Sequence, residues 1–133
     1  MCIRDRYPTI RVVIDLHRDA IGSETKVDPA VEVDGKKAAQ VMLIAGCETE
    51  GGISHPNWRE NLRFALRLQQ SLETNYPGIT RPIKFMNTVY NENLTNGSLL
   101  MEVGTDATSV EQAIYSGELA ANSLSEVLKA LQE

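Results

Sequence analysis

The chain has 133 residues, of which 42% are hydrophobic and 23% charged, and its formal net charge is −5. This length predicts one domain with a core of its own. The acidic balance argues against nucleic acid as a partner, because the longest basic run is Lys36–Lys37 and phosphate binding needs grouped basic side chains. No stretch reaches the roughly 18 continuous apolar residues of a transmembrane helix.

The first half of the chain has the pattern of several strands. Residues 10–16 are β-branched and nearly all apolar, which predicts a buried strand. A polar loop is expected over residues 18–29. Asp34–Gly35 is a typical hairpin turn between residues 31–33 and the apolar residues 38–45, so we expect an antiparallel element there.

Two helices are expected in the second half. Asn57 and Glu60 have the spacing of a capping box at the start of an amphipathic helix, which ends at the sequence Tyr76–Gly78. Thr108 and Glu111 have the same spacing before a last amphipathic helix. Strands that alternate with such helices along the chain predict an α/β domain with a largely parallel sheet.

Shorter elements separate the two helices. Residues 46–56 form a long polar connection, and residues 83–90 predict a strand or an extended segment. A polar turn over residues 91–97 then leads to a strand over residues 99–103. Loops as long as the first connection are often functional in a compact domain.

One charged residue lies within the apolar strand 99–103. Glu102 would be costly there without a cation, hydrogen bonds or a raised pKa. Strand alternation places it on the face opposite to that of its immediate neighbours. Two interpretations stay open, namely a catalytic carboxylate and a salt bridge to Arg11, Arg18 or Arg81.

A histidine follows the other buried strand directly. His17 lies where sites form in open α/β sheets, so it is either a zinc ligand or a histidine that is hydrogen-bonded in a turn. Arg18 and Asp19 either orient His17 or form a solvated pair. His55 either reaches a site or, as is common for a loop histidine, is exposed. Asn91 has mainly the character of a turn residue.

Five sequence blocks together resemble one known family. In chain order they are Asp15–Asp19, Ser54–Leu62, Tyr76–Ile83, Tyr90–Glu92 and Leu99–Gly104. Each block is modest, but all five in this order resemble the stage II sporulation protein P family. The resemblance covers roughly residues 8–131.

The resemblance implies a fold and an activity. The family belongs to the zinc-dependent N-acetylmuramoyl-L-alanine amidases, whose fold is a three-layer α/β sandwich with helices around a mixed, mostly parallel sheet. It implies peptidoglycan as the substrate and cleavage of the amide between N-acetylmuramic acid and L-alanine. A cross-link endopeptidase activity is also attributed to the family. His17 matches the last zinc ligand of the family, and Glu102 matches its catalytic glutamate.

Other family features follow from the same resemblance. The positions of Arg18, Asp19, His55, Arg81 and Asn91 suggest roles in substrate binding or in support of the metal ligand. In the family the complete protein is extracytoplasmic and membrane-anchored. It acts during sporulation engulfment beside the stage II sporulation proteins D and M.

The chain departs from the family at its start. The family has a further histidine and a glutamate ligand on an upstream strand, whereas no histidine precedes His17 here. We therefore expect residues 1–7 to be a non-native leader and residues 8–133 to be the C-terminal part of one catalytic domain. Such a fragment would lack the first strand or strands, have an incomplete zinc site and be inactive by itself.

Two rival functions are kept. One is a non-catalytic cell-wall-binding or scaffold module with the same fold. The other is a metal-free hydrolase that uses His17 or His55 with a carboxylate, although the chain has no Gly-x-Ser-x-Gly nucleophile motif and no phosphate-binding glycine loop.

Overall fold

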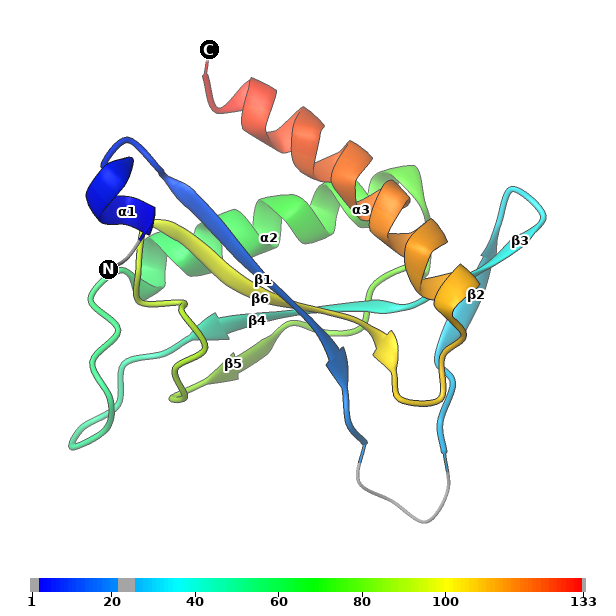
Figure 1. Cartoon of the computed structure of the whole chain (residues 1–133), viewed down its shortest axis with the longest axis horizontal. Coiled ribbons are helices and arrows are strands. Elements are labelled where there is room, and N and C mark those ends of the chain that lie inside the picture. Colours follow the sequence, from blue (N-terminus) through cyan, green and yellow to red (C-terminus); the bar gives the residue numbers. More distant parts are fainter. Residues whose placement is uncertain (1–2, 22–25, 133) are drawn as a thin grey trace.

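The computed structural model describes residues 3–21 and 26–132, and Figure 1 shows how their helices and strands are arranged. In chain order these are α1 (Ile3–Arg6), β1 (Val12–Asp19), β2 (Ala30–Val33), β3 (Lys36–Ala39), β4 (Val41–Gly46), α2 (Trp58–Asn75), β5 (Lys84–Met86), β6 (Gly97–Thr105) and α3 (Val110–Ala130). None of the helices in these ranges is long and apolar enough to cross a bilayer.

The central sheet has four strands in the order β1-β6-β4-β5. The β1–β6 and β4–β5 pairs are parallel, and the β4–β6 pair is antiparallel. This confirms the expected α/β class with a mixed, mostly parallel sheet. The antiparallel pairing in the sheet joins β4 to β6, whereas β2 and β3 form a separate two-stranded hairpin.

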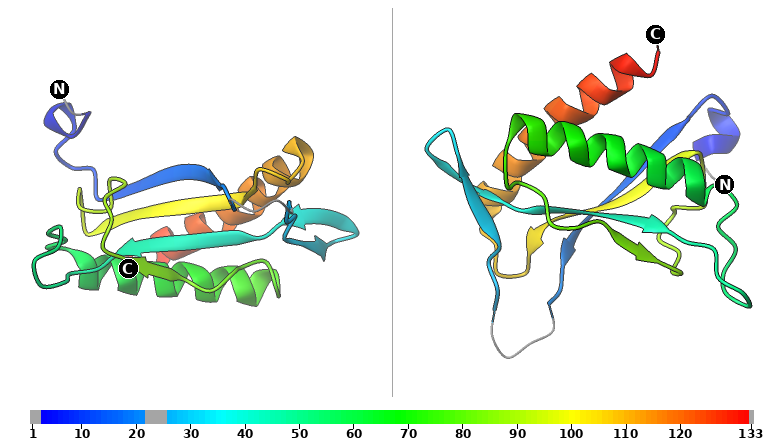
Figure 2. Two further views of the ribbon diagram at one scale, coloured as in Figure 1. Left: turned by 90° about the horizontal axis from the view of Figure 1, so that it is seen from below. Right: turned by 180° about the vertical axis from the view of Figure 1, so that it is seen from behind.

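Both long helices cover the same face of the sheet, as the two views of Figure 2 show. Leu99, Met101 and Val103 of β6 point toward this face and join one apolar core with residues of α2 and α3. The predicted flanking of the sheet by helices is therefore confirmed. Among the described residues, helices α2 and α3 supply one layer beside the sheet, and the opposite face carries no long helix.

The opposite face, called the open face below, has a much smaller apolar cluster. Met42, Ile44 and Leu100 form it, and Met86 packs at its side. Strand alternation places these residues one position away from those that point into the main core. The open face is therefore free to carry polar side chains on the same strands.

Helix α2 forms because its apolar residues recur at helical spacing and dock on β4. Phe64, Leu68 and Leu72 are buried in the main core. The capping box predicted at its start is wrong. Asn57 has ψ of 11° rather than the extended backbone of an N-cap, and its side chain makes no capping hydrogen bond.

The start of α3 is shifted by one residue from the prediction. Ser109 is the N-cap and forms a capping box with Gln112. The side chain of Thr108 instead accepts a hydrogen bond from the backbone N–H of Thr105 at 2.9 Å. The threonine therefore stabilises the turn before the helix rather than the helix itself.

Strand β1 begins at Val12 and ends at Asp19, so it both starts and ends later than the predicted strand 10–16. The predicted loop therefore starts later as well. The pairing of β1 with β6 continues to Asp19, which lies opposite Thr105. The register shifts by one residue between His17 and Asp19, and Gly104 has φ of +69° at this bulge. The bulge lets both strands continue, so His17 lies inside a strand rather than after one.

Candidate active site

The two residues singled out for chemistry lie side by side on the open face. His17 of β1 is paired in register with Glu102 of β6 in the parallel ladder. Paired residues on neighbouring strands point to the same face of a sheet. The structure therefore brings the predicted histidine and glutamate together on one face of the sheet.

Glu102 is buried without a compensating partner. Only 8% of the residue is exposed, and its Oε2 atom has no hydrogen-bond partner among the described residues. Burial raises the pKa of this carboxyl above its ordinary value, and the nearby Asp19 carboxylate adds to the effect. The charges of His17, Arg81 and Lys84 act in the opposite direction but do not outweigh it.

Arg81, whose charge lowers the pKa of Glu102, is paired with another carboxylate. Arg81 Nη1 donates to Asp19 Oδ2 at 2.8 Å, and only 16% of the Arg81 side chain is exposed. Within residues 3–21 and 26–132, no ion pair forms between Glu102 and an arginine. The salt-bridge interpretation of Glu102 therefore finds no support in the side-chain geometry.

Arg81 has further donor capacity. Its Nε and Nη2 atoms are buried and have no hydrogen-bond partner in the described part of the chain. A guanidinium has five N–H donors, so the Asp19 contact uses only part of them. The site therefore combines an unsatisfied acceptor on Glu102 with unsatisfied donors on Arg81.

His17 is half exposed and contacts Asp15 and Tyr90. Its Nε2 atom lies 3.2 Å from Asp15 Oδ1, and 41% of its side chain is exposed. The Tyr90 ring meets it edge to face, with 6.1 Å between ring centroids. Asn91 Nδ2 donates to the other oxygen of Asp15 at 2.9 Å. The predicted residue Asn91 is therefore part of the site.

Sequence reasoning missed Asp15 and Tyr90 as parts of the site. The spacing of Asp15 and His17 could have revealed the first, because residues i and i+2 of a strand lie on one face. Tyr90 is separated from His17 by most of the chain, so local spacing carries no signal for it.

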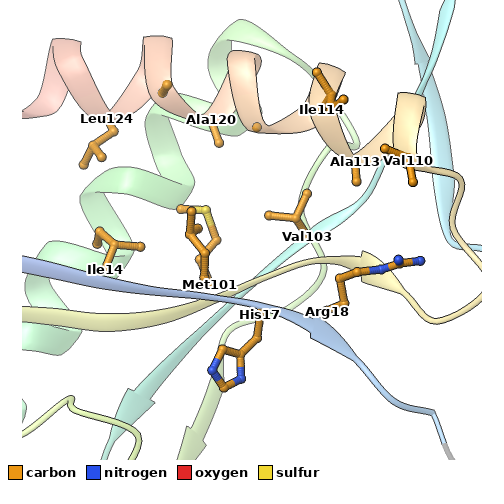
Figure 3. Close-up of a pocket in the computed structure, with 13 residues that line it drawn as sticks. Ile14, His17, Arg18, Met101, Val103, Val110, Ala113, Ile114, Ala120 and Leu124 are labelled. Atoms are coloured by element: carbon orange, nitrogen blue, oxygen red, sulfur yellow. The ribbon is translucent and has the colours of Figure 1, made fainter.

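The Arg18 side chain points to the other side of β1 and makes its hydrogen bonds away from Glu102. Its Nη2 atom donates to the backbone oxygens of Thr105 at 2.8 Å and Thr108 at 2.6 Å. Figure 3 shows Arg18 apart from His17, whose ring points away from α3. Arg18 therefore stabilises the turn between β6 and α3.

A groove of about 780 Å³ lies on the helix side of β1, between β1, β6 and α3. Apart from His17 and Arg18, its lining is made of apolar side chains and Gly117, with Met101, Val103 and Ile114 among them. Since Glu102 points to the open face, the carboxylate lies across the sheet from this groove.

His55 is not brought to Glu102, and it is buried rather than exposed. Only 1% of His55 is exposed, and its ring covers Gly46 so closely that a Cβ there would lie 2.1 Å from Nδ1. Gly46 is the last residue of β4, whereas Glu102 pairs with Met42 near the start of that strand. Packing against Gly46 replaces the exposed position expected of a loop histidine.

The described residues do not fit a zinc site by themselves. Among residues 3–21 and 26–132, no three or more histidine, cysteine, aspartate or glutamate side chains are grouped so as to hold a metal ion. Catalytic zinc takes three protein ligands. Among the described residues, the Glu102 carboxyl has a raised pKa because it is buried.

Three comparisons relate the chain to known proteins. It matches the family model described as stage II sporulation protein P over residues 3–125. It is 30% identical over 123 residues to stage II sporulation protein P of Bacillus subtilis (strain 168). The match covers 89% of this chain and 28% of that protein, so the chain spans little more than a quarter of its relative's length.

A solved structure has a similar fold. The apo form of the N-acetylmuramyl-L-alanine amidase of Mycobacterium abscessus matches with a TM-score of 0.59 and 14% sequence identity. The match covers 98% of this chain and 58% of the amidase chain. At this identity the likeness shows a shared fold alone.

Proposed function

This chain belongs to the stage II sporulation protein P family, and we propose that it carries part of the active site of a peptidoglycan hydrolase. The observation that supports this most strongly is the buried Glu102 carboxyl, which has an unpartnered oxygen and lies beside His17 on the open face. A carboxyl with a perturbed pKa in such surroundings is a candidate for proton transfer.

In the proposed reaction Glu102 moves one proton. The bond to be cleaved is the amide between N-acetylmuramic acid and L-alanine. Glu102 takes a proton from the attacking water, whose oxygen bonds to the amide carbonyl carbon. The carbon–nitrogen bond then breaks, and the proton passes to the nitrogen of L-alanine. A raised pKa brings the proton affinity of Glu102 closer to that needed at neutral pH.

Zinc is part of the proposal, with His17 as one ligand. The described residues supply no complete ligand set, so the remaining ligands would have to come from other residues of the protein. The cross-link endopeptidase activity, the partner proteins D and M, and an extracytoplasmic, membrane-anchored location during engulfment are likewise proposals that rest on the family.

The test uses the protein made from the full reading frame that contains these residues. Purified peptidoglycan is digested, and mass spectrometry detects the new amino groups. A new amino group on L-alanine marks amide cleavage, whereas one at the cross-link marks endopeptidase cleavage. Glu102→Gln should lower the rate by about 100-fold or more, while the exposed Glu32→Gln leaves it unchanged.

Two results would contradict the proposal. Full activity in Glu102→Gln would remove the proposed role of this carboxyl. A wild-type protein that binds peptidoglycan without cleaving any bond would favour the rival wall-binding module.

A further inference from the structure

A row of paired residues crosses the open face from one edge of the sheet to the other. Asp15 of β1 pairs with Leu100 of β6, which in turn pairs with Ile44 of β4. Ile44 pairs with Lys84 of β5. Paired residues lie on the same face of a sheet, and β1 and β5 are the edge strands. An acidic side chain therefore marks one edge of the open face, and a basic side chain marks the other.

The middle of this row is apolar. Leu100, Ile44 and Met42 are buried in one small cluster, called the apolar floor below. Among the described residues, no long helix covers this side of the sheet (Figure 2). Met42 is paired with Glu102, so the apolar floor extends from the Glu102 carboxyl toward β5. A substrate that reaches Glu102 can therefore continue over apolar side chains in the direction of Lys84.

The charge of Lys84 is not balanced by an ion pair in the described part of the chain. Lys84 is exposed, and no ion pair within residues 3–21 and 26–132 includes it. Burial raises the pKa of Glu102, and the charge of Lys84 is among those that oppose this rise. The two groups are therefore close enough to interact. Arg81, another cation that acts on Glu102, is already paired with Asp19.

The span from Glu102 to Lys84 matches a short piece of peptide. The two residues are two strands apart and differ by one open-face position along the strands, which places their Cα atoms about 12 Å apart. The flexible four-carbon side chain of lysine covers part of this span. A residue of extended peptide covers at most about 3.5 Å. With the scissile amide at Glu102, the residue that follows L-alanine therefore lies within reach of the ammonium group.

We propose that Lys84 binds a carboxylate on the residue that follows L-alanine, so that the peptide lies over the apolar floor toward β5 and the muramic acid faces β1. The inference rests on the proposed function, because it gives a direction to the substrate of that same site. The ammonium group can turn its three N–H donors toward such a carboxylate. Asp15, at the opposite edge, repels the same carboxylate, so the charges of both edges favour one orientation.

A lysine on an edge strand can also serve the fold. Exposed lysines there discourage the pairing of one sheet edge with another. That role depends on the positive charge and not on which peptide is bound. A comparison of two substrates therefore separates recognition of the peptide from protection of the edge.

The test uses two synthetic muramoyl peptides and the protein made from the full reading frame. Both peptides carry D-glutamate after L-alanine, with its side-chain carboxyl amidated, and they differ only in whether the α-carboxyl is free or amidated. Calorimetry measures binding in Glu102→Gln, so that the ligand is not consumed. The free carboxylate should bind roughly fivefold more tightly, as expected for one exposed ion pair. In the protein that retains Glu102, the same preference should appear in KM rather than in kcat.

Three further variants assign the preference to Lys84. Lys84→Gln should weaken binding of the free carboxylate alone and so remove the preference, whereas Lys84→Arg should retain it. Lys129→Gln, which removes an exposed positive charge from α3, should leave the preference unchanged.

Several results would overturn the inference, namely equal binding of the two peptides, binding of neither, or a preference that remains in Lys84→Gln. Cleavage of the muramoyl amide at equal KM for both peptides would refute this inference and sustain the proposed function. A preference that depends on Lys84 in a protein that cleaves neither peptide would sustain this inference and refute the proposed function.

Discussion

The helix-covered face and the open face of the sheet are built from the same strands but surround their side chains differently. On the covered face, Leu43 and Leu99 are buried among other apolar residues. On the open face, Glu102 and Arg81 have buried polar atoms without partners. Successive residues of a strand serve the two faces in turn. The comparison teaches that one face supplies stability while the other holds groups at an energetic cost.

The largest expected effect is on the covered face. Leu68 of α2 is fully buried in the main core, so Leu68→Ala should lower the free energy of unfolding by about 2–5 kcal/mol. Leu66 lies two residues away in the same helix and is 55% exposed, so Leu66→Ala should cost no more than about 0.5 kcal/mol. Chemical denaturation of both variants measures the difference, and equal losses would contradict this description of the core.

A satisfied glutamate on the helix side provides the contrast to Glu102. Burial by itself would raise the pKa of Glu73. Its hydrogen bonds from the Thr80 hydroxyl at 2.6 Å and from the backbone N–H groups of Gly78 at 2.9 Å and Thr80 at 2.7 Å outweigh burial and lower it. Glu73→Gln should therefore cost about 1–3 kcal/mol at neutral pH.

The pH dependence of this effect has a definite sign. Because folding lowers the pKa of Glu73, its stabilisation is present above the pKa of the unfolded chain and is lost as the pH falls through the folded pKa. Denaturation of wild type and Glu73→Gln between pH 7 and acidic pH should show the two stabilities converging. Glu32→Gln is the control, and a gap that does not change with pH would refute the interpretation.

An intermediate effect is expected at Asn91. Asn91→Ala and Asn91→Gly both lose the amide that binds Asp15, but glycine adopts the φ of +69° without a steric penalty. The alanine variant should therefore be less stable than the glycine variant by about 1 kcal/mol. Thermal unfolding of the two proteins measures this, and equal stability would show that the loop is not held in the left-handed conformation.

The smallest expected effect on stability belongs to Glu102 and has the opposite sign to that of Glu73. Folding raises the pKa of Glu102, so ionisation of the folded protein is unfavourable and stability falls as the pH rises from the unfolded to the folded pKa. Glu102→Gln should be at least as stable as the wild type at neutral pH, with the difference vanishing at acidic pH. A variant that is less stable at every pH would show that the carboxylate is satisfied after all.

Much of the fold could be predicted from the sequence because the apolar periodicity is strong. The strands around Ile14, Leu43 and Met101 and both long helices were predicted at their places. The ends were less certain. The bulge at Gly104, which extends β1 to Asp19, was not predicted although a glycine within a strand pattern is typical of a bulge, and backbone conformation overrode the capping signal of Asn57.

The candidate site was predictable only in part. Strand alternation and the family resemblance selected His17 and Glu102, and the parallel ladder places them together. Which arginine would face Glu102 depends on tertiary structure, so Arg18 and Arg81 could not be told apart in advance. Tyr90 was missed because its contact with His17 joins distant segments, whereas the i, i+2 spacing of Asp15 and His17 was a local signal that was not used.

Because of the bulge at Gly104, the number of residues in β6 determines where the turn after this strand lies. Between His17 and Asp19, β1 advances by two residues while β6 advances by three, from Glu102 to Thr105. Deleting one residue there would equalise the two strands and pull the following turn toward the sheet, away from the backbone oxygens that Arg18 now binds. Deleting a single residue at this point would therefore act differently from a substitution, because it would move the start of α3 while leaving the upstream half of β6 in place.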